Sequence, residues 1–340
     1  MSVNTYPYGT NAEIISIAQK FLPQLELSRP VLSLLPNRSI NESMVIIEQR
    51  DNYQGLMGPR GYNGAPDKIN PVGMSRFAME PGVYGGFAEI DEQELTVRRE
   101  EGTFNQPMDM STLVLERIIQ VTDAEVRCRE YLSWQLFASG SYTSFDAKGA
   151  LIDSKAFTQR VFTATTSWAT YASSTPLADW STVSLLHRGY SVRFDRSATG
   201  FMNLKTANNQ RLNTNSSDLG GKRRDMGATF NSISDINKLY LENDLPQTET
   251  YDEGYYDTSG VFHAYIPDNT VIVKGTRAGN SQIGEWIFTR NANNPGSQPG
   301  IYMRVFDNME RAVPRTIEVH RGFNGGPNVM YPSAIPVMQV

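Results

Sequence analysis

The sequence has one cysteine, three histidines and no long apolar run. A single cysteine, Cys128, excludes a disulfide framework within the chain. The histidines His187, His263 and His320 lie too far apart in sequence to build a structural zinc site of known spacing with it. No apolar run approaches the roughly 20 residues of a membrane-spanning helix, and the N-terminal residues lack the segments of a secretory signal. These absences predict a protein that folds in the cytoplasm without a metal, a cofactor or a membrane.

Positive charge does not gather in a stripe. The net charge is −5, whereas proteins that grip nucleic acid by its phosphates normally carry a basic surface. The densest basic run is 222–224, and its position after two glycines is typical of a solvated loop. A mildly acidic chain without a basic stripe is not expected to grip nucleic acid by its phosphates.

Catalytic motifs are also missing. The sequence has no nucleophile elbow, no phosphate-binding loop and no dinucleotide fingerprint after a strand. The acidic residues of 249–257 alternate with tyrosines, which favours an exposed strand with aromatic cross-strand contacts over a metal or acid–base site. The isolated tryptophans are more typical of core or interface anchors than of base or sugar stacking; they are Trp134, Trp168, Trp180 and Trp286. We therefore expect a protein that is not an enzyme.

The longest regular element is an amphipathic helix from Met110 to Ala138, about 40 Å long. Asp109 or Ser111 is the expected N-cap, and Gly140 the expected stop. Cys128 is expected as a small buried side chain on the packing face. The charged residues are expected on the solvated side, with 125/129 and 123/127 as i,i+4 pairs; they are Glu116, Arg117, Asp123, Glu125, Arg127, Arg129 and Glu130.

The segment before this helix is rich in glycine and proline. A short helix is predicted over 11–22, ended by Pro23, and the apolar residues of 31–35 suggest an arm that packs on a partner. Strands are predicted at 44–50 and 86–99. Between them glycines recur every third residue from 55 to 64, too few triplets for a collagen helix. A loop this long is generally functional or ordered by a partner.

Mixed helices and strands follow the long helix. Strands are predicted at 150–153, 160–165, 248–252, 261–266 and 270–274. Helices are predicted at 177–190, after Thr175-Pro176, and after a capping box at Ser232 and Asp235. Two closing strands, 316–319 and 335–340, are predicted on either side of a glycine-rich turn at 322–327.

The order and local sequence of these elements resemble the major capsid proteins of lambda-type tailed phages, which share the Hong Kong 97 capsid fold. The resemblance rests on the helix and strands around Ser234-Asp-Ile-Asn-Lys-Leu-Tyr, Thr250-Tyr-Asp-Glu and Tyr265-Ile-Pro-Asp. It also rests on the closing Ile317-Glu-Val-His-Arg-Gly-Phe and Tyr331-Pro-Ser-Ala-Ile-Pro-Val. It covers most of residues 40–340.

The resemblance implies an α+β chain with a defined order of parts. These are an N-terminal arm (1–43), an extended hairpin loop (44–106), a peripheral domain with the spine helix (107–165), an axial domain (166–312) and return strands of the peripheral domain (313–340). The implied function is self-assembly as hexamers and pentamers into an icosahedral head around phage double-stranded DNA. An encapsulin-like nanocompartment shell is the alternative. A secreted β-rich hydrolase would need an export signal and a catalytic site, which the sequence lacks.

The glycine-rich loop holds the expected inter-subunit contacts, which are Gly55, Gly58, Arg60, Gly61, Tyr62, Gly64 and Lys68. In the founding member of the fold a loop lysine is crosslinked to an asparagine of a neighbour. Lys68 is a loop lysine here, and the sequence around it does not identify the same crosslink. The resemblance implies other copies of the chain as partners, with a cementing or decoration protein, a portal and a scaffold. The packaged DNA would lie inside without sequence-specific binding. The expected location is the virion capsid, after synthesis in the host bacterial cytoplasm.

Overall fold

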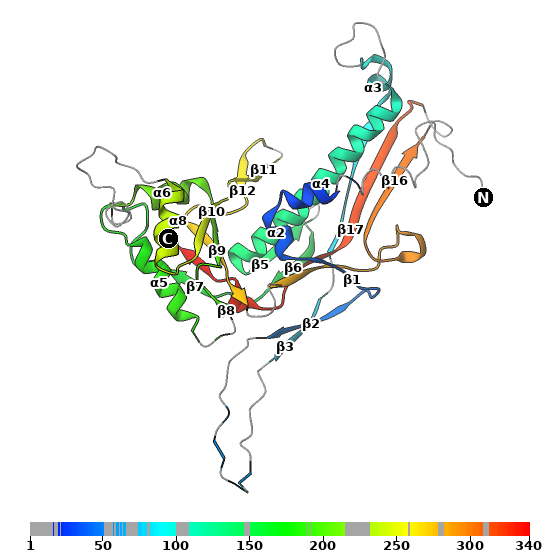
Figure 1. Cartoon of the computed structure of the whole chain (residues 1–340). Helices are drawn as coiled ribbons and strands as arrows, with labels where there is room; N and C mark the ends of the chain where they lie inside the picture. Colours follow the sequence, from blue (N-terminus) through cyan, green and yellow to red (C-terminus); the bar gives the residue numbers. More distant parts are fainter. Residues whose placement is uncertain are drawn as a thin grey trace.

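The computed structural model describes residues 16, 20, 22–50, 57, 59–60, 62, 64–65, 74–79, 82–99, 109–145, 150–188, 190, 192–214, 232–257, 259–277, 282–308 and 313–340. Two five-stranded sheets, here sheet A and sheet B, are joined by one long helix. Figure 1 shows sheet A running beside this helix and sheet B lying at its C-terminal end, surrounded by shorter helices.

The long helix α4 spans Met110–Ser139, which confirms the prediction to within one residue. Asp109 is the N-cap residue, and its carbonyl accepts the first helical hydrogen bonds. Gly140 ends the helix in the left-handed region (φ 71°) and donates its N–H to the carbonyl of Leu136 at 2.9 Å. Glycine is favoured there because it has no Cβ to clash at positive φ.

Sheet A is organised around its longest strand. It contains β1 (Asn37–Ser39), β4 (Gly82–Ile90), β15 (Gly284–Phe288), β16 (Ile301–Asp307) and β17 (Ile317–Val329). Strand β17 pairs antiparallel with β4, β15 and β16, while β1 pairs parallel with β15. The first half of α4 packs on this sheet through a separate apolar cluster, made of Ile90, Leu113, Val114, Ile118, Val121, Met303, Val305, Ile317 and Val319.

The predicted glycine-rich turn at 322–327 is wrong, because β17 runs through it without a break. The glycines permit close backbone approach instead. A Cβ on Gly322 would lie 2.4 Å from the carbonyl oxygen of Tyr84, and one on Gly325 would lie 2.1 Å from that of Ile287. Glycine inside a strand often marks such a close approach.

Gly325→Ala is therefore expected to lower the free energy of unfolding by about 2–3 kcal/mol, because the added methyl group overpacks against backbone that cannot move aside. Gly86→Ala is the matched control, since no atom lies within 4 Å of its added Cβ. This control should change stability by less than about 1 kcal/mol. Guanidinium unfolding of the two variants measures the difference, and equal stabilities would contradict the close-approach explanation.

Sheet B has the order β10–β9–β13–β18–β7. Its strands are β10 (Gln247–Thr250), β9 (Thr199–Met202), β13 (Thr270–Lys274), β18 (Val337–Gln339) and β7 (Val161–Thr163). The surrounding helices are α5 (Pro176–Leu186), α6 (Leu204–Leu212) and α8 (Ile233–Glu242). The predicted capping box of α8 is confirmed, with Ser232 and Asp235 each accepting from the other's backbone N–H.

The four tryptophans are completely buried, which confirms their structural interpretation; they are Trp134, Trp168, Trp180 and Trp286. The main core extends from the C-terminal half of α4 into sheet B and the adjoining end of sheet A. No helix in the described part of the chain is both long and apolar enough to cross a membrane.

Four two-stranded hairpins or ribbons complete the β-structure. They are β2 (Val45–Arg50) with β3 (Met74–Met79), β5 (Ser141–Phe145) with β6 (Leu151–Ala156), β8 (Val192–Arg193) with β14 (Thr276–Arg277), and β11 (Gly254–Tyr256) with β12 (Phe262–Ala264). The predicted strand over 86–99 is wrong beyond Ile90. Helix α3 (Glu92–Val97) begins there, because the Asp91 side chain caps it by accepting from the N–H of Glu94 at 2.7 Å.

The N-terminal segment differs from its prediction in two ways. Residues 22–27 are helical, so the predicted end of a helix at Pro23 is wrong. The apolar residues of 31–35 include the short helix α2 (Pro30–Leu34), and they are buried in the chain's own main core, against α4. This segment was expected to pack on a partner, and it packs on α4 of the same chain.

The sheets also cross the segment bounds inferred from the resemblance. Strands β15 and β16, from within 166–312, pair in sheet A, while β18, from within 313–340, pairs in sheet B. Backbone pairing between segments distant in sequence decides this placement.

Candidate assembly site

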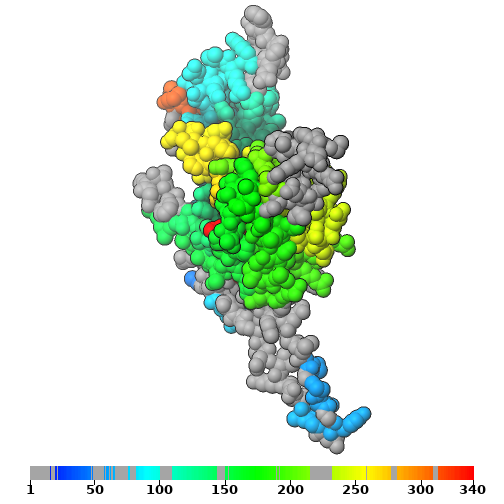
Figure 2. Space-filling model, turned by 90° about the vertical axis from the view of Figure 1, so that its left-hand side faces the viewer, coloured from blue at the N-terminus to red at the C-terminus, as the bar shows by residue number. Residues whose placement is uncertain are grey.

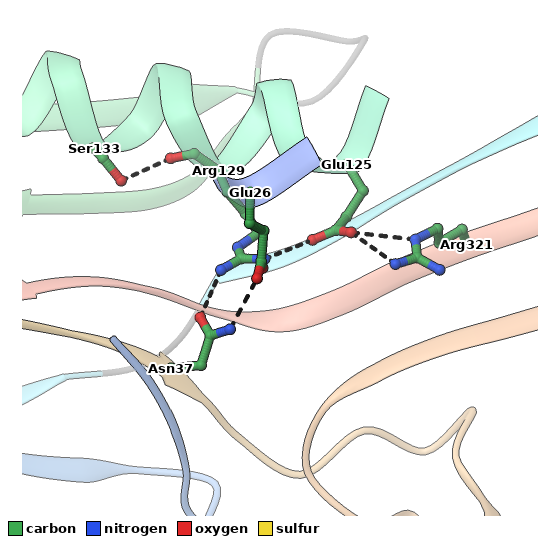
Figure 3. A network of polar contacts seen from close by, with 6 residues as sticks. All are labelled: Glu26, Asn37, Glu125, Arg129, Ser133 and Arg321. Carbon is green, nitrogen blue, oxygen red and sulfur yellow. Dashed lines mark hydrogen bonds and ion pairs between the residues drawn. The ribbon is translucent and has the colours of Figure 1, made fainter. Parts of the chain in front are cut away.

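Residues 22–40, here called the strap, are joined to the long helix α4, here called the spine helix, by a largely buried charge network (Figure 3). Arg129 of α4 is only 1% exposed. Its Nη1 donates to Glu26 Oε1 at 2.5 Å, and its Nη2 donates to Asn37 Oδ1 at 2.6 Å. Its guanidinium also lies 5.1 Å from the ring centroid of Trp286. One helix residue therefore holds both ends of the strap.

Glu125 extends the network into sheet A. Its Oε1 accepts from Arg129 at 3.3 Å, and its Oε2 accepts from Nε and Nη2 of Arg321 at 3.2 and 2.9 Å. All three side chains are buried. Paired hydrogen bonds from a guanidinium group to a carboxylate are strong and fix the relative orientation of the two side chains. The bonds from Arg321 to Glu125 therefore hold α4 in position against β17.

A second buried ion pair joins the strap to the spine helix and to the segment after β10. Nη1 of Arg29 lies 3.1 Å from Oε2 of Glu130, and Tyr251 donates its hydroxyl to the other oxygen of Glu130. Burial raises the pKa of the Glu130 carboxyl, although the bond from Tyr251 and the charge of Arg29 oppose that shift. Arg29 thus joins the strap to two other parts of the chain.

The prediction that Glu125, Arg129 and Glu130 lie on the solvated side of α4 is wrong, because all three are buried. The predicted i,i+4 pairs are confirmed, with 3.3 Å between Arg129 and Glu125 and 2.8 Å between Arg127 and Asp123. Burial arises because α4 is covered by sheet A, by the strap and by the segment containing Tyr251. Tyr251 itself is buried, unlike the exposed strand expected around it.

Three other titratable side chains, those of Cys128, Lys155 and Asp257, are buried or bonded to neighbouring groups of the chain. Burial raises the pKa of the Cys128 thiol to about 12, which keeps it from acting as a thiolate nucleophile. Lys155 lies 3.2 Å from Asp153 Oδ2, and burial lowers the pKa of its ammonium group to about 8 despite that partner. Asp257 accepts from the backbone of the β11–β12 turn and contacts His263 at 2.9 Å. In the part of the chain that the structure describes, no group of three potential ligands is placed to hold a metal.

The glycine-rich loop lies between β2 and β3, which extend away from both sheets (Figure 1). Of the expected contact residues, Arg60, Tyr62 and Gly64 are described and exposed, and Arg60 Nη1 lies 3.4 Å from the Gly64 carbonyl oxygen. Tyr62 is fully exposed, and the nearby Met57 is 80% exposed. The remaining candidates, Gly55, Gly58, Gly61 and Lys68, lie outside the described residues.

A second exposed surface was not predicted. On the face of sheet A opposite its α4 contact, the ring of His320 stacks on Phe87 (5.0 Å) and meets Phe306 edge-on (5.1 Å). Both phenylalanines are about half exposed. Clustered apolar groups on a surface commonly mark a contact with another protein. This surface could have been predicted only from the register in which β4, β16 and β17 pair, and a single sequence does not give that register.

Two crystal structures resemble this arrangement over almost its whole length. A protein assigned as a prophage capsid protein, from Escherichia coli CFT073, aligns with a TM-score of 0.63 over 100% of this chain and 99% of that chain, at 13% identity. A phage-related protein from Bordetella bronchiseptica RB50 aligns with a TM-score of 0.58 over 97% and 96%, at 10% identity. Comparison with curated proteins gives no match. The chain thus has a Hong Kong 97-type capsid fold.

A family model described as phage major capsid protein E matches residues 32–288, well over half of the chain. The chain belongs to the phage major capsid protein E family. The predicted fold class and the predicted role as a tailed-phage major capsid protein are confirmed, and the encapsulin alternative is not favoured.

Proposed function

We propose that this capsid protein assembles through direct contacts between its own copies, as hexamers and pentamers, into the icosahedral head around phage double-stranded DNA. The observation that carries the proposal is the projecting β2–β3 hairpin, whose described tip residues Met57 and Tyr62 are almost wholly exposed. A subunit gains nothing from exposing these side chains, whereas a neighbour can bury them.

The buried charge network supports a structural rather than a catalytic role. Its carboxylates and guanidinium groups are bonded to one another; Glu125, Arg129 and Arg321 are buried, and Glu26 is partly buried. They hold the strap, the spine helix and sheet A in one frame from which the hairpin projects. We therefore propose that the chain is not an enzyme and that arm, hairpin loop, peripheral domain and axial domain are parts of one assembling unit. In this division β15 and β16 go with the peripheral domain and β18 with the axial domain.

Further partners follow from the same proposal. A cementing or decoration protein, a portal and a scaffold would bind the assembled shell, and the DNA would lie inside it without sequence-specific contacts. The net charge of −5 favours a wall that does not adhere to the DNA. The protein would be made in the host bacterial cytoplasm and end in the virion capsid.

The purified chain is expected to form closed shells as its concentration is raised, seen by electron microscopy and by sedimentation. The corresponding particles from phage-producing cells should contain double-stranded DNA. A chain that stays monomeric under all assembly conditions would contradict the proposal, and shells filled with a cargo enzyme in place of DNA would support a nanocompartment.

A further inference from the structure

The body around sheet B carries acidic and basic surfaces at two separate places. From 247 to 273 the sequence has five acidic residues and no lysine or arginine. Arg188, Arg193 and Arg196 lie within nine residues of one another in the segment that follows α5. Figure 1 shows the β11–β12 hairpin and the α5–β8 region on opposite sides of this body.

The acidic surface, here called the hairpin face, also has exposed apolar groups. Tyr255 on one side of the hairpin packs on Tyr131 of the spine helix at 5.0 Å. Its neighbour Tyr256 points to the opposite side, as strand geometry requires, and contacts the cross-strand Phe262 at 5.4 Å. Tyr256 is 73% exposed, and Figure 2 shows the hairpin, in yellow, open to solvent beside the green helices. The hairpin is thus rooted on one side and uncovered on the other.

The acidic side chains of the hairpin face are available to a partner. Asp252 and Glu253 are both exposed. The contacts that they make are a hydrogen bond of 3.2 Å from the N–H of Leu204 to Asp252 and a 3.9 Å approach of Glu253 to Arg29. Of the other carboxylates in 247–273, Asp268 faces Lys205 at 2.5 Å and Asp257 contacts His263 at 2.9 Å. The open negative charge beside the hairpin is therefore that of Asp252 and Glu253.

The basic surface, here called the α5 groove, has the complementary character. It is a groove of about 620 Å³ whose lining includes Leu185, Arg188 and Arg193. Leu185 and both arginines are exposed, and among the described residues neither arginine has a carboxylate at salt-bridge distance. The acidic Asp195 and Asp244 also line it; Asp244 faces Arg196 at 3.9 Å, and Asp195 accepts from Ser197 and interacts electrostatically with Arg193. The three arginines therefore exceed the two carboxylates by one positive charge. An acidic, partly apolar partner fits this groove.

We infer that the hairpin face of one copy binds the α5 groove of the next copy around a ring. The inference rests on the proposed function, since it names the surfaces through which copies meet. A two-fold contact would set acidic face against acidic face, whereas a head-to-tail contact pairs opposite charges and buries Tyr256 and Phe262 against Leu185. Repeated head-to-tail contacts close into rings when the rotation permits.

The test uses charge reversal in the full chain. Asp252→Lys with Glu253→Lys reverses the hairpin face, and Arg188→Glu with Arg193→Glu reverses the α5 groove. Each double variant is expected to raise the concentration needed for assembly by at least about tenfold, because like charges then oppose each other. The four substitutions together in one chain should restore assembly. Lys238→Glu, on the exposed surface of α8, is the control and should assemble as the unaltered chain does.

Neutral variants keep the test decisive if a reversed chain does not fold. Asp252→Asn with Glu253→Gln, and Arg188→Gln with Arg193→Gln, remove charge but retain hydrogen-bonding groups, and each should weaken assembly and reduce its salt dependence. Normal assembly of folded single-face variants overturns the inference, and so does failure of the four-fold variant to recover. Failure of the unaltered chain to assemble contradicts the proposed function instead, so the two failures are distinguishable.

Discussion

Arg129→Ala is expected to lower the free energy of unfolding by about 3–5 kcal/mol, because breaking a buried ion pair leaves uncompensated charge in the interior. The substitution removes the partner shared by Glu26 and Glu125 and the donor to Asn37. It also removes the packing of the guanidinium against Trp286. Arg321 still faces Glu125, so the carboxylate that loses its ion pair is that of Glu26, whose side chain is 24% exposed.

Arg127→Ala is the matched control, with the same substitution two residues earlier in the same helix. Its side chain is 54% exposed, and it pairs with Asp123 at 2.8 Å. Surface i,i+4 pairs contribute only about 0.3–0.5 kcal/mol, so this variant should unfold close to the unaltered protein. Arg129→Lys should fall between the two, because a single ammonium group keeps the charge but cannot reproduce the fork that reaches Glu26 and Asn37 together.

Guanidinium unfolding of the unassembled subunit, at one fixed low concentration, measures these differences without a contribution from shell contacts. If Arg129→Ala and Arg127→Ala have the same midpoint and slope, the network in Figure 3 does not hold the strap to the helix.

The spine helix could be predicted because its signals are local. Apolar residues recur at helical spacing, and Asp109 and Gly140 bound the run, so no distant contact was needed to find it. The capping box at Ser232 and Asp235 is local in the same sense. Both predictions are confirmed.

The path of β17 could not be predicted, because distant segments decide it. Glycines at 322–326 favour a turn by local rules, but β4 on one edge and β15 and β16 on the other hold them extended. The contact surface around His320 has the same origin, since Phe87 and Phe306 come from strands more than 200 residues apart in sequence.

The burial of charged residues on α4 could not be predicted from the sequence either. Arg127 and Arg129 are the same residue type, each with an acidic residue four positions earlier. Helical phase separates them, but the number of sides on which the helix is covered does not follow from its own sequence. The strap supplies one of those sides, and its apolar residues suggested only that some partner was needed.

The β2–β3 hairpin is the part of the proposed assembly that the sequence indicated most directly. Removal of its tip is expected to prevent shell formation without unfolding the subunit. The last described pair of the β2–β3 ladder joins Arg50 to Met74, so residues 51–73 can be replaced by Asn-Gly, which suits a two-residue hairpin turn. The shortened loop loses less entropy on closing, so the free energy of unfolding should be unchanged or higher. Electron microscopy should then show no closed shells at concentrations where the full chain forms them.

Tyr62→Ala tests the same contact with one side chain. A buried tyrosine at an interface contributes about 2 kcal/mol or more, and this loss recurs in every copy, so the concentration needed for assembly should rise by at least about tenfold. Tyr62→Phe is the control, because it keeps the ring and its apolar area and should assemble nearly as well. The subunit itself should be indifferent to both, since Tyr62 is fully exposed in it. A tip-deleted chain that still closes into shells would place the essential contacts elsewhere, on sheet A or on the body around sheet B. A Tyr62→Ala chain that assembles normally, beside a tip-deleted chain that does not, would assign the contact to other loop residues.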